Sequence, residues 1–197
     1  ELPREFEASG VPVSQRGART NEALEIMRRL FTEDDVHFDG EFNQLSGVTL
    51  EPKPLQQPSP PIWISGRKEA AWRRAARYGS GWLPYMYTPE MLEESNQRIA
   101  QYRSEEGNDN PVDPGLFIFF CCHEDNATAV EYANERLSKQ YNQDFSQMID
   151  KYAIAGDPDR CVERLTEYID AGARTIILSA ASPMNYVERA ESLMAQE

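Results

Sequence analysis

Four short apolar segments, each followed by residues with a helical pattern, constrain the fold of this chain more than any other feature. The segments are residues 62–65, 81–84, 115–122 and 174–180. They are apolar at most positions, which is typical of strands buried on both faces of a parallel sheet. The alternation of such strands with helices indicates the α/β class with right-handed crossovers.

The segments between the apolar runs carry helix signals. Thr88-Pro89 and Asp157-Pro158 are typical helix starts, because the first side chain caps free N–H groups and proline suits the first turn. Thr20 is the expected N-cap of an earlier amphipathic helix. The expected helices are residues 20–31, 68–78, 88–107, 126–152 with a break near 141–145, 157–172, and a last one after Pro183.

Two features between residues 36 and 61 are not helical. Asp39-Gly40 is a two-residue turn signal between Phe38 and Phe42, so we expect a β-hairpin there. Five prolines between residues 52 and 61 exclude a helix or a central strand. This connector delivers the chain, extended, to the first buried strand.

The charge balance and the cysteine content exclude several classes of function. The chain has 33 acidic and 20 basic residues among 197, a net charge of −13, which disfavours nucleic acid and anionic membranes as partners. No apolar run is long enough for a membrane span. Three cysteines without CxxC spacing and two histidines form no metal-ligand pattern. We therefore expect a reduced, cytoplasmic protein without a metal site.

Two architectures of the α/β class fit this order of elements: a doubly wound open sheet and a (β/α)8 barrel. A barrel has eight strands in about 250 residues, whereas this chain provides four. We expect a single domain over residues 1–197 that forms the C-terminal half of a barrel. The sequence opens without Met in a loop-like stretch, ELPREFEASG, and we expect that an N-terminal half is absent from it.

Four motifs, in this order, resemble those of the bacterial luciferase-like flavin-dependent oxidoreductases. They are SQRGARTNEALEIMRRLFTEDDVHFDGEF, PKPLQQPSPPIWISG, RRAARYGSGWLP and GDPDRCVERLTEYIDAGARTIIL. The resemblance covers nearly all of the chain and implies a TIM barrel. It implies a cofactor, FMN or the deazaflavin coenzyme F-420, at the C-terminal ends of the strands. It also implies an oxidoreductase or monooxygenase that acts on a small organic substrate.

The turn after the first apolar segment is the candidate cofactor site. Ser65 and Gly66 end the strand, and free N–H groups at the start of the next helix favour an anion. Arg67 and Lys68 can add charge, with Arg67 gripping phosphate oxygens through two donors, or they can simply begin a solvated helix face. The resemblance implies that this turn holds the flavin phosphate, although many members have a second glycine where this chain has Arg67. Replacing Gly66 by Val is expected to weaken cofactor binding and to leave the fold intact.

Residues at the ends of later strands are the other site candidates. Tyr85, Met86 and Tyr87 follow the second strand and can line a substrate pocket or serve as packing residues. His123 ends the third strand, where it can act as an acid–base group near neutral pH or simply as a polar strand end. The connection 124–156 can cover the site as a lid, pack as a helix pair on the outside, or form a dimer contact.

Two functions remain open at this stage. One is a flavin- or deazaflavin-dependent enzyme, and the other is a truncated, non-catalytic half-barrel that binds a flavin or a partner. No Gly-rich dinucleotide fingerprint is present, so a nicotinamide would be handled by the missing half or by another protein, such as a separate flavin reductase. The unpaired edges of a half-barrel sheet favour a homo-oligomer or association with the missing half.

Overall fold

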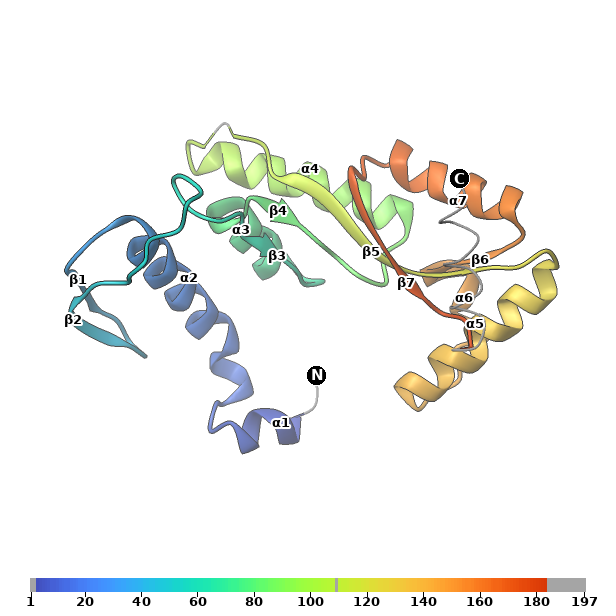
Figure 1. Ribbon diagram of the computed structural model, residues 1–197, viewed down its shortest axis with the longest axis horizontal. Coiled ribbons are helices and arrows are strands. Elements are labelled where there is room, and N and C mark those ends of the chain that lie inside the picture. The colour runs from blue at the N-terminus through green and yellow to red at the C-terminus, as the bar shows by residue number, and fades with distance from the viewer. Residues whose placement is uncertain (1–2, 109, 184–197) are drawn as a thin grey trace. The chain divides into compact units, whose positions relative to one another are not determined.

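A computed structural model describes residues 3–108 and 110–183 of the protein (Figure 1). Two compact units make up the chain, Glu1–Ile62 and Trp63–Glu197. The prediction of a single domain stays a prediction, and every predicted cofactor and substrate residue lies in the second unit. The helix expected after Pro183 lies outside the described residues.

The first unit consists of helices followed by a β-hairpin. Its elements are α1 (Pro3–Ala8), the 3-10 turn η1 (Val13–Gln15), α2 (Arg16–Thr32), β1 (Val36–Asp39) and β2 (Gln44–Val48). The prediction that Thr20 caps α2 is wrong, because the helix begins at Arg16. Thr20 Oγ1 instead donates a hydrogen bond to the Arg16 carbonyl oxygen at 2.7 Å.

The predicted hairpin is confirmed, but its turn is longer than two residues. Asp39 pairs with Gln44 in the antiparallel ladder, so four residues connect the strands. The Glu22 carboxylate accepts a hydrogen bond from the Phe42 N–H at 3.1 Å, and the Arg19 guanidinium lies 4.4 Å from the Phe42 ring centre. The longer loop thus lets α2 hold the tip of the hairpin.

The second unit contains a larger sheet and the helices that pack on it. Its strands are β3 (Trp63–Ile64), β4 (Gly81–Trp82), β5 (Asp113–Cys122), β6 (Ala153–Gly156) and β7 (Thr175–Ala180). Its helices are α3 (Glu69–Tyr78), α4 (Pro89–Glu105), α5 (Asn126–Tyr141), α6 (Ile149–Tyr152) and α7 (Pro158–Asp170). All four predicted strands are present, and β6 is an addition. The predicted helix break falls at Asn142, whose left-handed φ of +51° ends α5.

All strand pairs of this sheet are parallel, which confirms the α/β prediction. β3 pairs with β4, and β4 pairs with the beginning of β5. Along the rest of β5, β7 occupies one edge and β6 the other, since Phe119 pairs with both Ala153 and Ser179. β6 therefore shares an edge of β5 with β4, and β5 is the strand that joins the sheet together (Figure 1).

The helices cover β5 from both faces. Two right-handed crossovers that run in opposite directions across a sheet place their helices on opposite faces of that sheet. The chain passes through α5 to β6 and then through α7 to β7, so α5 and α7 face each other across the sheet. Packing agrees, because Phe119 and Cys121 belong to the cluster that contains the buried face of α5. The helix α5 is thus on the face of the sheet opposite the helix layer of α3, α4 and α7.

Buried polar groups fix that helix layer to the sheet. The Tyr168 hydroxyl of α7 donates to the Tyr87 carbonyl oxygen at 2.7 Å. The Trp82 indole of β4 donates from Nε1 to Ser95 Oγ of α4 at 3.2 Å. Because all four residues are nearly inaccessible to solvent, each bond also satisfies a group that water cannot reach.

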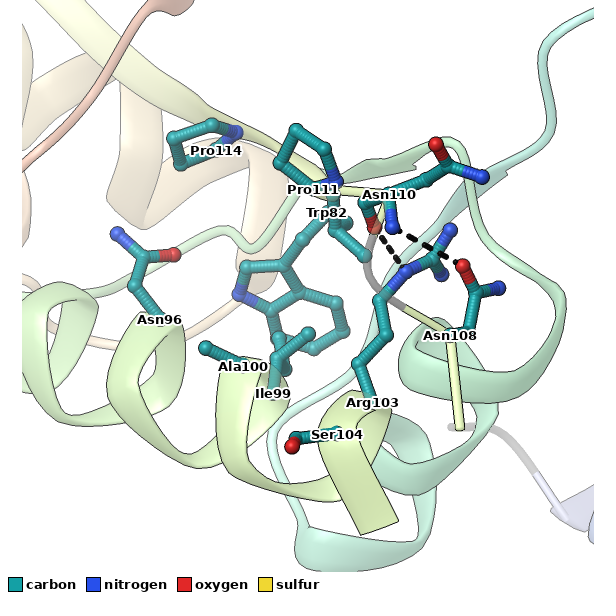
Figure 2. A pocket seen from close by; sticks show the side chains of 11 residues that line it. Trp82, Asn96, Ile99, Ala100, Arg103, Ser104, Asn108, Asn110, Pro111 and Pro114 are labelled. Atoms are coloured by element: carbon teal, nitrogen blue, oxygen red, sulfur yellow. Dashed lines mark hydrogen bonds between the residues drawn. The ribbon is translucent and has the colours of Figure 1, made fainter. Parts of the chain in front are cut away.

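Arg103, near the end of α4, holds the end of α3 in place. Its Nη1 donates to the carbonyl oxygens of Ala76 at 2.8 Å and Gly79 at 3.0 Å. Its Nε donates to the Asn110 carbonyl oxygen, a bond drawn in Figure 2. The last carbonyl groups of a helix lack partners within the helix and carry partial negative charge. A buried guanidinium at this position therefore serves the fold.

We expect Tyr168→Phe to lower the free energy of unfolding by about 1–2 kcal/mol at neutral pH, because the Tyr87 carbonyl group loses its buried donor. Burial raises the pKa of Tyr168 to about 12, against about 10 in an unfolded chain. The stability that comes from the neutral phenol is therefore complete below about pH 10 and is lost as the pH rises toward about 12. Urea unfolding of both proteins across this range should show a shallower alkaline decline for the variant. Equal declines would contradict the assignment.

Candidate functional site

Parallel strands bring their carboxyl ends to one edge of a sheet, where the sites of α/β proteins lie. Residues 65–68 follow β3, residues 85–87 follow the short strand β4, and His123 follows β5. All the residues predicted from the sequence as site residues thus belong to this edge, which is the candidate site.

The turn 65–68 precedes a helix that has no side-chain cap. Lys68, the N-cap residue of α3, is extended and makes no capping hydrogen bond with its side chain. In contrast, Thr88, Asp125 and Asp157 cap the helices α4, α5 and α7 that follow the next strands. The positive end of α3 is therefore not offset by a capping oxygen, which favours an external anion. We name residues 65–68 the phosphate turn.

Gly66 allows the phosphate turn to pass close to α3. Its φ is +153°, and a Cβ atom at this position would lie 2.4 Å from the Ala71 Cβ atom. Glycine alone among the residues combines this backbone conformation with the absence of a side chain. The expectation that Gly66→Val leaves the fold intact is therefore wrong, since the new side chain would collide with α3.

Arg67 lies beside a residue from a distant segment. Its Cζ atom is 5.9 Å from the ring centre of Tyr152, and the Lys151 Nζ atom is 5.1 Å from the same centre. Both distances are within the range of cation–π contacts. Tyr152 ends α6 directly before β6, so the returning end of segment 124–156 reaches the phosphate turn. The Lys68 side chain is exposed.

Tyr85, Met86 and Tyr87 have three different environments. Tyr85 is 40% exposed and pairs with Phe117 of β5. Met86 has a φ of +52°, which is rare for a residue other than glycine, and packs against the cluster under α5. Tyr87 is 1% exposed, and its hydroxyl accepts a hydrogen bond from Trp72 Nε1 at 3.3 Å. The geometry favours a packing role for Tyr87 and leaves Tyr85 accessible.

An aromatic row crosses the face of the sheet on which α5 packs. Phe117 pairs with Tyr85 on one side and with Ile177 on the other, and residues in register across parallel strands point to the same face. Tyr141 of α5 is 38% exposed, and its ring centre lies 6.1 Å from that of Phe119. These side chains form an apolar and aromatic surface suited to a flat or apolar ligand.

His123 is held by the loop that follows β5. Its Nδ1 accepts a hydrogen bond from the Asp125 N–H at 3.0 Å, and its ring meets Tyr132 edge-on at 5.8 Å between centres. A neutral imidazole that accepts at Nδ1 carries its proton on Nε2. The Thr128 N–H, a donor to Asp125 at 2.8 Å, lowers the pKa of that carboxyl group and keeps it ionised. Nε2 is the nitrogen of His123 that can donate a proton.

The two ends of segment 124–156 are tied together at the candidate site. Asn126 Oδ1 accepts from the Asp157 N–H at 2.8 Å, and Asn126 Nδ2 donates to Asp157 Oδ2 at 2.7 Å. The His123 N–H also donates to the Gly156 carbonyl oxygen at 2.9 Å. The segment therefore leaves and rejoins the sheet at one fixed point.

A cavity of about 310 Å³ lies at the opposite edge of the sheet, away from the predicted residues. Figure 2 shows Trp82, Asn96 and Arg103 among the side chains around it. The Arg103 guanidinium already donates to three carbonyl oxygens there. We interpret this cavity as a packing feature between α4 and the amino ends of the strands, because its charged group serves the fold.

Residues 3–108 and 110–183 contain neither a metal-ligand cluster nor a membrane-spanning helix. Within these residues, no three His, Cys, Asp or Glu side chains are placed to hold one metal ion. In the same part of the chain, no helix is both long enough and apolar enough to cross a membrane. Cys121, Cys122 and Cys161 form no disulfide bonds.

Comparison with known sequences identifies the family. Residues 1–175 match the luciferase-like monooxygenases, and the chain belongs to this family. An uncharacterized protein of Mycobacterium tuberculosis (strain H37Rv) is 37% identical over 111 residues, which are 56% of this chain and 38% of that protein. The F420-dependent glucose-6-phosphate dehydrogenase of Nocardia farcinica is 25% identical over 202 residues, covering 91% of this chain and 60% of that protein. The chain thus spans 38% to 60% of the length of these relatives.

Solved structures confirm the luciferase-like barrel fold. The monooxygenase RslO1 from Streptomyces bottropensis matches with a TM-score of 0.80 and 25% identity, covering 100% of this chain and 64% of that chain. An F420-dependent secondary alcohol dehydrogenase in complex with an F420-acetone adduct matches with a TM-score of 0.75 and 21% identity, covering 87% and 58%. The sheet of the second unit is therefore part of a barrel architecture.

The sequence did not predict β6 or the position of Tyr152 beside the phosphate turn. The apolar stretch Ala153–Gly156 directly before the Asp157 cap was a signal for a short buried strand. No comparable signal existed for Tyr152, since its contact with Arg67 joins two segments far apart in the sequence.

We expect Gly66→Ala to lower the free energy of unfolding by about 1–3 kcal/mol, through backbone strain and the collision with Ala71. Ala71→Gly should cost about 1 kcal/mol from lost helix propensity. The double variant should lose less than the sum of the two, because Ala71→Gly removes the atom that the new Cβ meets. Urea unfolding of the four proteins measures this coupling. Strictly additive losses would show that Ala71 does not limit the turn.

Proposed function

We propose that the protein is a flavin- or deazaflavin-dependent oxidoreductase or monooxygenase that acts on a small organic substrate. The observation that carries the proposal is the uncapped start of α3 behind Gly66, at the strand edge where the luciferase-like fold has its site. In this proposal Ser65 and Gly66 bring the backbone to the cofactor phosphate, and Arg67 and Lys68 add positive charge.

The cofactor, when bound, supplies the redox chemistry, and this chain supplies position and electrostatics. Two of the similar proteins are named as F420-dependent dehydrogenases, and one solved structure of the same fold, a riboflavin lyase, contains a modified FMN, which supports both candidate cofactors. We keep FMN and coenzyme F-420 as the alternatives for this chain. The phosphate turn suits either, because each carries a phosphate group at a distance from its ring system.

The aromatic row is the proposed wall for the substrate or the cofactor ring. Tyr85 and Phe117 present flat apolar surface beside Tyr141, and Met86 packs behind them. His123 is the candidate proton donor through Nε2, because its Nδ1 is engaged by the Asp125 N–H.

The test of the proposed function is binding of FMN, riboflavin and coenzyme F-420 to the chain, followed by native mass spectrometry and fluorescence titration. Binding of FMN or F-420 supports the proposal, and weaker binding of riboflavin than of FMN supports the phosphate turn. Cofactor binding without turnover of any substrate would favour the alternative, a non-catalytic flavin-binding half-barrel. Absence of binding to all three would contradict the proposal.

We expect Arg67→Gly to weaken FMN binding by about 1 kcal/mol, the value of one charge-assisted contact, because the backbone of α3 provides most of the anion binding. Riboflavin, which lacks the phosphate, should bind both proteins equally. The measurement is the dissociation constant against salt concentration. A several-fold larger loss that disappears at high salt would show that Arg67 dominates the site, since salt screens exposed charges.

We also expect the isolated chain to associate with a second copy or with a barrel half that completes it. Among the described residues β3 pairs on one edge only, and Trp63 of β3 and Ile177 and Leu178 of β7 are 38%, 42% and 45% exposed. Unpaired edges with apolar side chains favour such pairing. Light scattering combined with thermal unfolding tests this. A single monomeric species with cooperative unfolding would contradict it.

A further inference from the structure

Two cysteine side chains meet between the end of β5 and the first part of α7. Successive residues of a strand point to opposite faces of the sheet. Cys121 belongs to the cluster that contains the buried face of α5. Cys122, the last residue of β5, therefore points to the other face, on which α7 packs. Cys161 lies in α7 and is buried against this face.

The sulfur atom of Cys161 lies at the paired ends of β5 and β6. Cys122 pairs with Gly156 in the parallel ladder. The Cys161 thiol donates to the Gly156 carbonyl oxygen at 3.6 Å and lies 4.0 Å from the Cys121 carbonyl oxygen. A side-chain hydrogen bond also joins Cys161 to Cys122. The two thiols are thus in direct contact, although their residues belong to different elements.

The three cysteines of the chain differ in their access to solvent. Cys121 and Cys161 are buried, whereas Cys122 is half-buried. Burial raises the pKa of Cys121 to about 11 and that of Cys161 to about 12, so both remain thiols at neutral pH. Oxidants react with cysteines that are accessible and can form a thiolate. Cys122 is therefore the cysteine that an oxidant in solution meets first.

A packing role explains Cys121 but not the other two cysteines. A cysteine inside an apolar cluster behaves as a small apolar residue, and Cys121 has such surroundings. Cys122 differs, because its side chain is both accessible and in contact with a second thiol. An accessible cysteine beside a second cysteine that can resolve its oxidised form is the arrangement of a peroxide-sensitive pair.

We propose that Cys122 and Cys161 form a reversible disulfide when the protein meets hydrogen peroxide. The Cys122 sulfur attacks one peroxide oxygen, the O–O bond breaks, and Cys122 becomes a sulfenic acid as one water molecule leaves. The Cys161 sulfur then attacks the Cys122 sulfur, the S–O bond breaks, and the hydroxyl group leaves as water with the Cys161 proton. The two sulfur atoms lose two electrons in total, and the peroxide takes them up. A dithiol reductant reverses the reaction by exchange.

The new bond joins α7 to the end of β5 next to the candidate site. His123 directly follows Cys122, and the Cys161 N–H donates to the carbonyl oxygen of Asp157, the N-cap residue of α7, at 2.9 Å. Oxidation therefore fixes the point at which segment 124–156 leaves and rejoins the sheet. The inference rests on packing within the second unit and is independent of the proposed function.

The test is treatment of the whole chain with a stoichiometric amount of hydrogen peroxide, followed by alkylation in denaturant and peptide mass spectrometry. We expect the number of thiols that can be alkylated to fall from three to one, with Cys122 and Cys161 linked and Cys121 still a thiol. Dithiothreitol should restore all three.

Matched variants separate the two steps of the reaction. Cys161→Ser should accumulate the sulfenic acid on Cys122, which dimedone traps, whereas Cys122→Ser should give neither the disulfide nor the trapped acid. Cys121→Ala is the control and should form the disulfide as readily as the wild type, because Cys121 lies on the other face of the sheet. Far-UV circular dichroism shows whether each variant is folded.

We expect the oxidised protein to unfold about 5–10 °C above the reduced protein, since the new bond closes a loop of about 40 residues in the unfolded chain. Thermal unfolding before and after treatment with dithiothreitol measures this shift. An oxidised protein that unfolds at a lower temperature would show that the folded pair is not placed for a disulfide.

Three further outcomes overturn the inference. One is a thiol count that stays at three after peroxide treatment of the folded chain. Another is a disulfide that includes Cys121 or that joins two chains. The third is a bond between Cys122 and Cys161 that forms only in denaturant, because the proposed contact exists only in the folded protein.

Discussion

The second unit depends on the pairing of β5. This strand, Asp113–Cys122, is long enough to pair with β4 at its beginning, with β6 at its end and with β7 along its middle. Its side chains alternate between two helix layers, so one strand carries both faces of the core. The positions of the phosphate turn, the aromatic row and segment 124–156 all follow from the register of this one strand.

Local signals predicted the parts of the fold that are decided within a few residues. Thr88-Pro89 and Asp157-Pro158 begin helices as expected, because a cap needs only its own side chain and an N–H group three residues later. The prediction of Thr20 as an N-cap was wrong, because no local signal around Thr20 indicates that the helix begins four residues earlier, at Arg16. β6 was missed because its signal, four apolar residues before the Asp157 cap, is too short to distinguish a strand from the end of the preceding helix.

The location of the candidate site was predictable from the sequence, but the contacts between its side chains were not. Residues 65–68, Tyr85 and His123 were recognisable because they follow strands, and parallel strands share an edge. The burial of Tyr87 and the approach of Tyr152 to Arg67 depend on tertiary packing between separate elements. A local sequence pattern does not indicate which residues from distant segments come into contact. The charge environment of the site therefore became visible only in three dimensions.

The reciprocal bonds between Asn126 and Asp157 have a consequence for how this family can vary. They join the two ends of the segment 124–156. The positions of the strand ends therefore do not depend on how many residues lie between Asn126 and Asp157. Extending a loop whose ends are already joined adds little entropic cost, since that cost grows only with the logarithm of length. Insertions and deletions here can remodel the cover over β5 while the barrel strands keep their register. The Asn126–Asp157 hydrogen bonds thus allow this segment to vary in length and sequence without a change in the sheet.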